Sequence, residues 1–220
     1  FFFKQKTAYE ISTRDWSSDV CSSDLHYKFS FAEMIDKLRT ITPRSEIILE
    51  EVPAPQKLAT YSFAFTADIQ NSLQSEDGGS EEIASGRFVI LHEPGGQDTW
   101  EGDFRCVTFL RADVDSEMQE DPLLPEVGWN WLLDSLSATE ASYTAPSGTV
   151  TRVSSSSFGK LAPRNEGSEI EIRASWTPLI SQIDDMALHV HAWCNLMSEV
   201  AGLPPIPDGV ASISSVRRRG

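Results

Sequence analysis

The sequence predicts a single α+β domain in which a mainly antiparallel sheet of about five or six strands is packed by three helices. Three observations lead to this fold class. Strand-like segments follow one another without a helix between them, amphipathic helical stripes lie near the start, middle and end, and no internal repeat is present. Consecutive strands favour antiparallel pairing under a layer of helices. The expected order is α-β-β-β-β-α-β-β-α, over one domain at residues 26–209 and a C-terminal tail at residues 210–220.

The first predicted helix begins at a capping box. Ser30 lies three residues before Glu33, the spacing at which each side chain can bond the other residue's backbone N–H. Apolar residues then recur at helical spacing as far as Ile41, and Pro43 is expected to stop the helix. Residues 47–51 are expected to form a short strand.

Three further strands are expected before the middle helix. From Thr60 to Ile69, apolar side chains alternate with small polar ones, which predicts a strand buried on one face. Residues 74–80 are polar and contain glycines, so a loop is expected there. Residues 87–92 and 104–112 are apolar strand segments that flank a Pro-Gly-Gly turn, which predicts a hairpin.

The second half contains two helices and two strands. An apolar stripe over residues 129–136 predicts the middle helix. Residues 148–153 and 169–176 are expected to be strands, and in the latter the even-numbered residues form the apolar face. Thr177-Pro178 is expected to open the last helix, and Gly202 is expected to cap its C-terminus.

Residues 1–25 are interpreted as a translated sequencing adapter and not as native protein. Back-translation of Lys4–Ile11 and of Asp15–Leu25 reproduces two parts of a common short-read library adapter in one reading frame. Ser12–Arg14 fall where the sample index lies. The alternative is a disordered arm rich in serine and aspartate. Foreign segments are excluded from fold reasoning, and the native N-terminus is then expected to be missing.

The remaining segment is strongly acidic. Removing three basic and four acidic residues from totals of 18 and 33 leaves 15 and 29, a formal net charge of −14. Such a charge opposes broad binding to nucleic acid or to anionic membranes. No apolar run approaches the roughly 20 residues that a membrane helix requires. Cys106 and Cys194 have no CxxC spacing and are expected to be buried, reduced thiols of a cytoplasmic protein.

Two clusters offer possible metal chemistry. His189, His191 and Cys194 lie on one predicted helix, but residues two apart point roughly 200° apart, so a shared metal is not expected. A buried thiol and two partly exposed imidazoles are the preferred interpretation. The acidic loop from Asp113 to Asp121 could bind a hard cation through oxygen ligands, although it lacks the calcium-loop pattern. A solvated acidic loop is preferred there.

Five arginines lie in or beside predicted strands of a protein that is short of basic residues. If several share one sheet face, they would form an anion-binding strip, because guanidinium binds carboxylate or phosphate in a bidentate manner. The alternative is structural pairing with Asp103, Glu169 or Glu171 across strands. The candidate ligand or partner residues are Arg87, Arg105, Arg111, Arg152 and Arg173.

A set of short segments is distributed along the chain. The segments are EEVPAPQ at 50–56, SGRFV at 85–89, WEG at 100–102, DPLLPEVGW at 121–129, SGTVT at 147–151, IRASWTP at 172–178, AWC at 192–194 and AGLPP at 201–205. Together they resemble an actinobacterial family catalogued as domain of unknown function 3000. The resemblance covers nearly everything from Ser30 to Gly209 and implies a cytoplasmic protein, without assigning an activity, cofactor or catalytic residue.

The element order also resembles the secretion-chaperone-like α+β fold, whose members often form homodimers and bind protein segments. The leading hypothesis is therefore a cytoplasmic, non-enzymatic binding or adaptor module, without a cofactor, for a partner protein or an acidic ligand. The alternative is a divalent-cation-dependent hydrolase or transferase that uses the acidic loop at residues 113–121. A thermal shift with magnesium, manganese or calcium would separate the two.

Overall fold

The computed structural model describes residues 27–71, 81–159 and 167–205, and its centre is a six-stranded antiparallel sheet. The strand order is β1-β2-β3-β4-β6-β5, and every neighbouring pair is antiparallel. The strands are β1 (Ile47–Glu51), β2 (Tyr61–Asn71), β3 (Glu81–Gln97), β4 (Gly102–Asp113), β5 (Tyr143–Ser155) and β6 (Gly167–Pro178).

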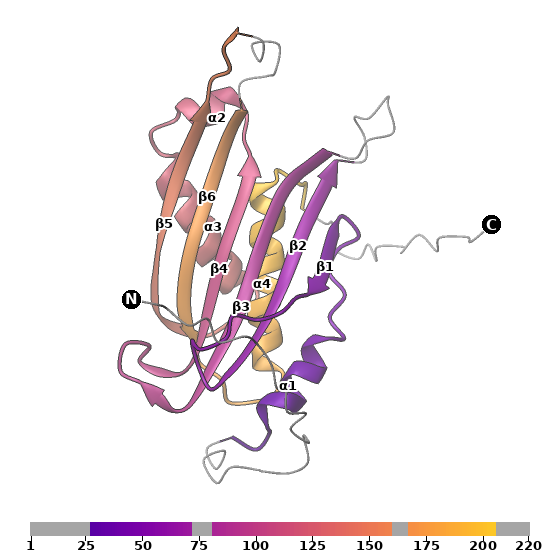
Figure 1. The fold of residues 1–220 in the computed structure, drawn as a ribbon, viewed down its shortest axis with the longest axis vertical. Coiled ribbons are helices and arrows are strands. Elements are labelled where there is room, and N and C mark those ends of the chain that lie inside the picture. Colours follow the sequence, from indigo (N-terminus) through magenta and orange to yellow (C-terminus); the bar gives the residue numbers. More distant parts are fainter. Residues whose placement is uncertain (1–26, 72–80, 160–166, 206–220) are drawn as a thin grey trace, which may run out of the picture.

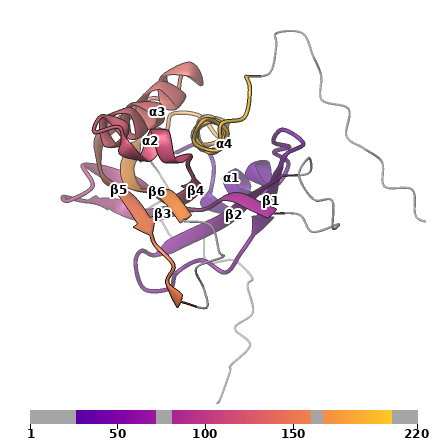
Figure 2. The ribbon, with the colours of Figure 1, turned by 90° about the horizontal axis from the view of Figure 1, so that it is seen from above.

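In the described part of the chain, the helices cover one face of this sheet and none lies on the other face (Figures 1 and 2). They are α1 (Phe31–Leu38), α2 (Ser116–Glu120), α3 (Leu124–Ala138) and α4 (Asp185–Val200). The predicted α+β class is therefore confirmed. The adapter interpretation, the loop predicted at residues 74–80 and the tail at residues 210–220 lie outside the described residues.

The ends of several elements differ from the prediction. Helix α2 is an additional element, since the sequence predicted three helices and not four. β3 and β5 extend beyond residues 87–92 and 148–153, because strand pairing with β2, β4 and β6 continues past their apolar centres. Thr177-Pro178 does not open the last helix: both residues end β6, and α4 begins at Asp185.

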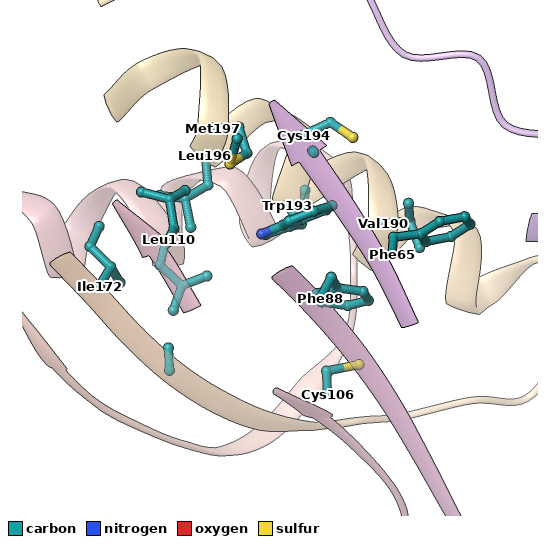
Figure 3. Close-up of a cluster of buried hydrophobic side chains, with 14 of the residues drawn as sticks. Phe65, Phe88, Cys106, Leu110, Ile172, Val190, Trp193, Cys194, Leu196 and Met197 are labelled. Atoms are coloured by element: carbon teal, nitrogen blue, oxygen red, sulfur yellow. The ribbon is translucent and has the colours of Figure 1, made fainter. Parts of the chain in front are cut away.

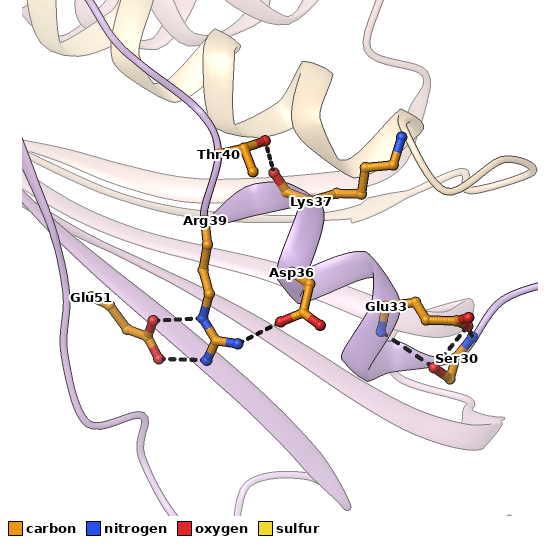
Figure 4. A network of polar contacts seen from close by, with 7 residues as sticks. All are labelled: Ser30, Glu33, Asp36, Lys37, Arg39, Thr40 and Glu51. Carbon is orange, nitrogen blue, oxygen red and sulfur yellow. Dashed lines mark hydrogen bonds and ion pairs between the residues drawn. The ribbon is translucent and has the colours of Figure 1, made fainter.

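The capping box predicted for α1 is present (Figure 4). The Ser30 side chain accepts from the Glu33 backbone N–H, and the Glu33 carboxylate accepts from the Ser30 backbone N–H at 2.7 Å. At the other end of the helix, Arg39 donates to Glu51 through Nε at 2.9 Å and also pairs with Asp36. These contacts tie α1 to the edge strand β1. The prediction for the last helix is also confirmed at Gly202, which follows α4 with φ of +65°.

The core lies between the helices and the covered face of the sheet (Figure 3). Trp193 of α4 is fully buried and stacks on Phe88 of β3, with ring centroids 5.3 Å apart. The helix comes this close because β3 has glycine at position 86: a Cβ there would lie 2.8 Å from the Met197 sulfur and 3.1 Å from the Trp193 ring. The two described cysteines are free and buried, as expected.

His189 is buried in this core, which corrects the expectation of a partly exposed imidazole. Only 1% of the residue is exposed. Its Nδ1 accepts from the Trp176 indole N–H at 3.1 Å, so its proton is on Nε2, where the ring is hydrogen-bonded to the Ser142 backbone. Burial lowers its pKa to about 4, so the ring is neutral at pH 7. Because both nitrogens have partners, the neutral ring can be buried at little cost. His191 is exposed, as expected.

Gly148 of β5 is expected to tolerate no side chain. A Cβ at this position would lie 2.5 Å from the Arg173 carbonyl oxygen and 2.8 Å from the Trp129 ring. We expect Gly148→Ala to lower the free energy of unfolding by about 2 kcal/mol through overpacking. Urea denaturation of this variant and of Gly167→Ala, where a Cβ would meet nothing within 4 Å, measures the effect. Equal stability of the two variants would contradict it.

Candidate functional site

The face of the sheet opposite the helices carries a shallow apolar groove. Directly opposed residues of antiparallel strands lie on the same face of the sheet. Residues paired with core residues therefore face the helices, and the residues that alternate with them face away. On β3 and β4 these include Val89 opposite Val107 and Arg87 opposite Phe109. The connection between β1 and β2 crosses part of this face and is anchored by the Val52 N–H, which donates to the Ala64 carbonyl.

The groove lies between that connection and the side chains of β3, β4 and β6 on this face of the sheet. Its volume is about 650 Å³. A small apolar cluster of Ala64, Val89 and Leu91 lies beneath and beside it. Leu58 on the connection is 55% exposed, which leaves an apolar rim open to solvent. The lining residues are Pro55, Leu58, Arg87, Val89, Leu91, Val107, Thr108, Phe109 and Arg173.

Two arginines bracket one end of the groove. Arg87 on β3 and Arg173 on β6 both lie directly opposite Phe109 of the intervening strand β4. Neighbouring strands are about 4.8 Å apart, so the two arginine Cα atoms are roughly 10 Å apart across the phenylalanine. Two long cationic side chains therefore flank one aromatic ring at the edge of an apolar surface.

The present partners of these two arginines leave local positive charge. Arg173 lies over the Phe109 ring, 5.1 Å from its centroid, and pairs with Glu171 at 3.0 Å. Arg87 donates to the Pro53 carbonyl at 2.5 Å, which also fixes the crossing connection. Within the described residues, the two guanidinium groups have one carboxylate partner between them, that of Glu171. In an acidic protein, this end of the groove is therefore suited to an anionic group.

Arg105 shares this face of the sheet but has a structural role. It is 8% exposed, and its guanidinium donates to the Ala145 carbonyl and to the hydroxyls of Thr177, Ser147 and Ser175, at 2.7 to 3.1 Å. Burial lowers the pKa of its guanidinium. These bonds hold the irregular start of β5, where the register shifts between Thr144 and Ser147.

The other two arginines lie outside the groove. Arg111 of β4 is on the same face and lies opposite Glu171, which is two residues from Arg173 along β6. Its guanidinium donates to Glu82 and Ser85. Arg152 opposes Ile170, a core residue, and therefore lies on the helix side, where it donates to the carbonyls of Gln119 and Asp121. Four of the five candidate arginines thus share the open face, where Arg87 and Arg173 line the groove and Arg105 and Arg111 are held by other partners, while Arg152 lies on the helix side.

The acidic loop has local structural roles. Asp115 is the N-cap of α2 and accepts from the Met118 backbone N–H at 2.7 Å. Asp121 accepts from the Leu123 backbone N–H at 2.8 Å, just before α3. In the described ranges, no group of three or more His, Cys, Asp or Glu side chains is placed to hold a metal ion. Asp115 therefore caps α2, and Asp121 fixes the turn that leads into α3.

A second hollow of about 680 Å³ lies between α3, α4 and the segment that joins α1 to β1. Its lining includes Asp134, His191 and Cys194. Burial raises the pKa of the Cys194 thiol to about 12, so the thiol is protonated at neutral pH and is a poor nucleophile. Burial also lowers the pKa of His191. This hollow offers polar groups but no activated thiol.

The crossing connection is the part of the site that sequence reasoning missed. The sequence predicts the strands on either side of it, at residues 47–51 and from Thr60, but gives no role to Pro55 and Leu58, which form one wall of the groove. An available signal was Leu58, a large apolar residue that follows the polar pair Gln56-Lys57 in a connection. It indicates contact with an apolar surface, but it does not say which one.

The described domain therefore combines an α+β fold with an open sheet face that carries an apolar groove edged by two arginines. The chain belongs to the family described as "Protein of unknown function (DUF3000)", whose model matches residues 28–211. This confirms the resemblance seen in the sequence. Comparison with curated proteins and with solved structures finds no match in either set. No helix in the described part of the chain is long and apolar enough to cross a membrane.

Proposed function

We propose that this domain is a non-enzymatic binding module and that the groove on its open sheet face holds a partner. The observation that carries the proposal is the row of Arg87, Phe109 and Arg173 at the end of an apolar groove. Apolar surface attracts a ligand without regard to direction, whereas two guanidinium groups at one end select and orient an anionic group. The preferred ligand therefore has an apolar part and an acidic part.

The cytoplasm is the compartment that we propose, because Cys106 and Cys194 are both free. Cytoplasmic proteins keep their thiols reduced, whereas oxidising compartments favour disulfides.

The net charge of the chain is negative, so the proposed acidic ligand must be attracted by the positive groups of the groove itself and not by the protein as a whole. A ligand recognised through general electrostatic attraction would be basic, whereas the two groove arginines favour an acidic one.

Binding of the fluorescent dye 8-anilinonaphthalene-1-sulfonate tests the groove, because the dye joins an apolar ring system to a sulfonate. We expect saturable binding to the folded domain and about tenfold weaker binding to Leu58→Glu, which places a carboxylate at the exposed rim. The matched control is Leu179→Glu, since Leu179 is 52% exposed and is not among the groove-lining residues. It should bind the dye as the unmodified domain does.

Unfolded or loosely packed protein also binds this dye, so thermal unfolding by circular dichroism must show the same Tm for both variants. Equal dye affinity in Leu58→Glu, Leu179→Glu and the unmodified domain would show that the groove is not the site. A reproducible rise of Tm with magnesium or manganese would instead favour the cation-dependent enzyme that uses residues 113–121.

A further inference from the structure

We infer that the groove recognises an extended segment of a partner protein in which apolar residues and an acidic residue alternate with solvent-facing ones. This inference rests on the proposed function and specifies its ligand. Three features of the groove support it: the spacing of side chains on the groove floor, the charge at one end and the exposure of the opposite side.

The spacing of the floor matches that of an extended chain. Moving two residues along β3 leads from Val89 to Arg87, and moving two residues along β4 leads from Val107 to Phe109. Two residues of a strand span about 6.7 Å, and the same distance separates side chains i and i+2 of an extended peptide. A peptide parallel or antiparallel to these strands would therefore place one side chain over the valines and another over Phe109.

The two rows of groove residues, one with the valines and one with Phe109, favour different kinds of peptide side chain. The row of Val89 and Val107 is apolar, and because Val89 is only 8% exposed, an aliphatic side chain would bury mainly the surface of the partly exposed Val107 there. The next row has Arg87 and Arg173 on either side of Phe109, so a glutamate or aspartate carboxylate can receive bonds from both guanidinium groups. The recognised pattern is an apolar residue, any residue, and then an acidic residue.

The open side of the groove favours a peptide over a small amphipathic molecule. Sites for small molecules bury most of the ligand surface, whereas this groove leaves Leu58 more than half exposed. An extended peptide suits such a surface because its alternate side chains point toward solvent and can be polar. A fatty acid would leave much of its hydrocarbon chain in water.

The test is isothermal titration calorimetry with three synthetic heptapeptides, blocked at both ends. The first has valine, leucine and glutamate at positions two, four and six and serine elsewhere. In the second, glutamine replaces glutamate, and in the third the glutamate is moved to position five, so it points to the opposite side of an extended chain. We expect the first peptide to bind about tenfold more tightly than either of the others.

The arginine contribution is tested with Arg173→Gln, which should remove that tenfold preference. Arg39→Gln is the matched control, because Arg39 is also about half exposed, pairs with a glutamate and lies 5.8 Å from a phenylalanine ring centroid. Arg39 lies at the end of α1 (Figure 4) and is not among the groove-lining residues. This variant should retain the full preference for the glutamate peptide, and higher salt should reduce that preference.

Other results of the peptide and dye experiments would contradict the acidic pattern, the peptide ligand or the groove as the binding site. Equal binding of all three peptides, weakened by Leu58→Glu, would keep the groove as the binding site and overturn the acidic pattern. Tighter binding of decanoate than of the glutamate peptide would replace the peptide with a small amphiphile. Absence of peptide binding together with unchanged dye binding in Leu58→Glu would overturn both the ligand class and the proposed function.

Discussion

Lowering the pH from 7 to 4 is expected to reduce the free energy of unfolding by about 3 kcal/mol through His189. The buried ring has a pKa of about 4 in the folded domain, against 6.5 when it is exposed. Between these values the unfolded chain binds a proton at this position and the folded domain does not. The stabilisation is therefore complete above pH 6.5 and is lost as the pH falls toward 4.

Urea denaturation at pH 7, 5.5 and 4, followed by circular dichroism, measures this loss. The control variant is His189→Gln, because a glutamine amide can accept from Trp176 and donate to the Ser142 backbone but does not titrate. Glu46, whose pKa is lowered to about 2 by its hydrogen bond from Arg44, contributes equally in both proteins. We expect the pH dependence of the variant to be clearly shallower. Parallel curves would show that His189 is not the group responsible.

Replacing Arg105 with lysine is expected to destabilise the domain by about 3 kcal/mol. The arginine donates to four neutral acceptors around the start of β5, and these include Thr177 and Ser175. A lysine ammonium is a compact charge with three donors, so it cannot reach all four acceptors in their present positions. At least one buried hydroxyl or carbonyl would lose its partner, and a strongly hydrated charge would remain buried.

The matched control for this prediction is Arg111→Lys. Arg111 lies on the same strand and the same sheet face, but half of its side chain is exposed and its ion pair with Glu82 is at the surface. We expect that substitution to change stability by less than about 0.5 kcal/mol. Denaturation in urea compares the two variants at pH 7. A similarly small effect at position 105 would mean that the four hydrogen bonds do not hold the start of β5.

Local patterns predicted the elements and the orientation of several side chains correctly. The alternation in β6 placed Trp176 in the core and Arg173 on the opposite face, and both placements are confirmed. The same reasoning could not distinguish Arg173 from Arg152. Which face Arg152 occupies depends on its pairing with Ile170, and a shift of one residue would reverse it. Register of this kind is set by the whole sheet.

The arrangement of the groove depends on contacts between distant parts of the chain. Strand β6 pairs with β5, its neighbour in the sequence, and also with β4. The pairing with β4 brings Arg173 beside Phe109. The wall at Pro55 and Leu58 comes from a connection whose path over the sheet has no periodic signal. Gly86 is similar: within a strand pattern it suggests a break, whereas the structure uses it to admit Trp193 and Met197.

The central claim is that the open sheet face binds a partner through the groove between Leu58 and Arg173. Two-dimensional nitrogen–proton NMR spectra of the nitrogen-15-labelled domain, titrated with the glutamate heptapeptide, test this most directly. We expect the largest chemical-shift changes at the backbone amides of four groove residues: Leu58, Val107, Phe109 and Arg173. Largest changes at Asp134, His191 and the other residues of the hollow between α3 and α4 would contradict it.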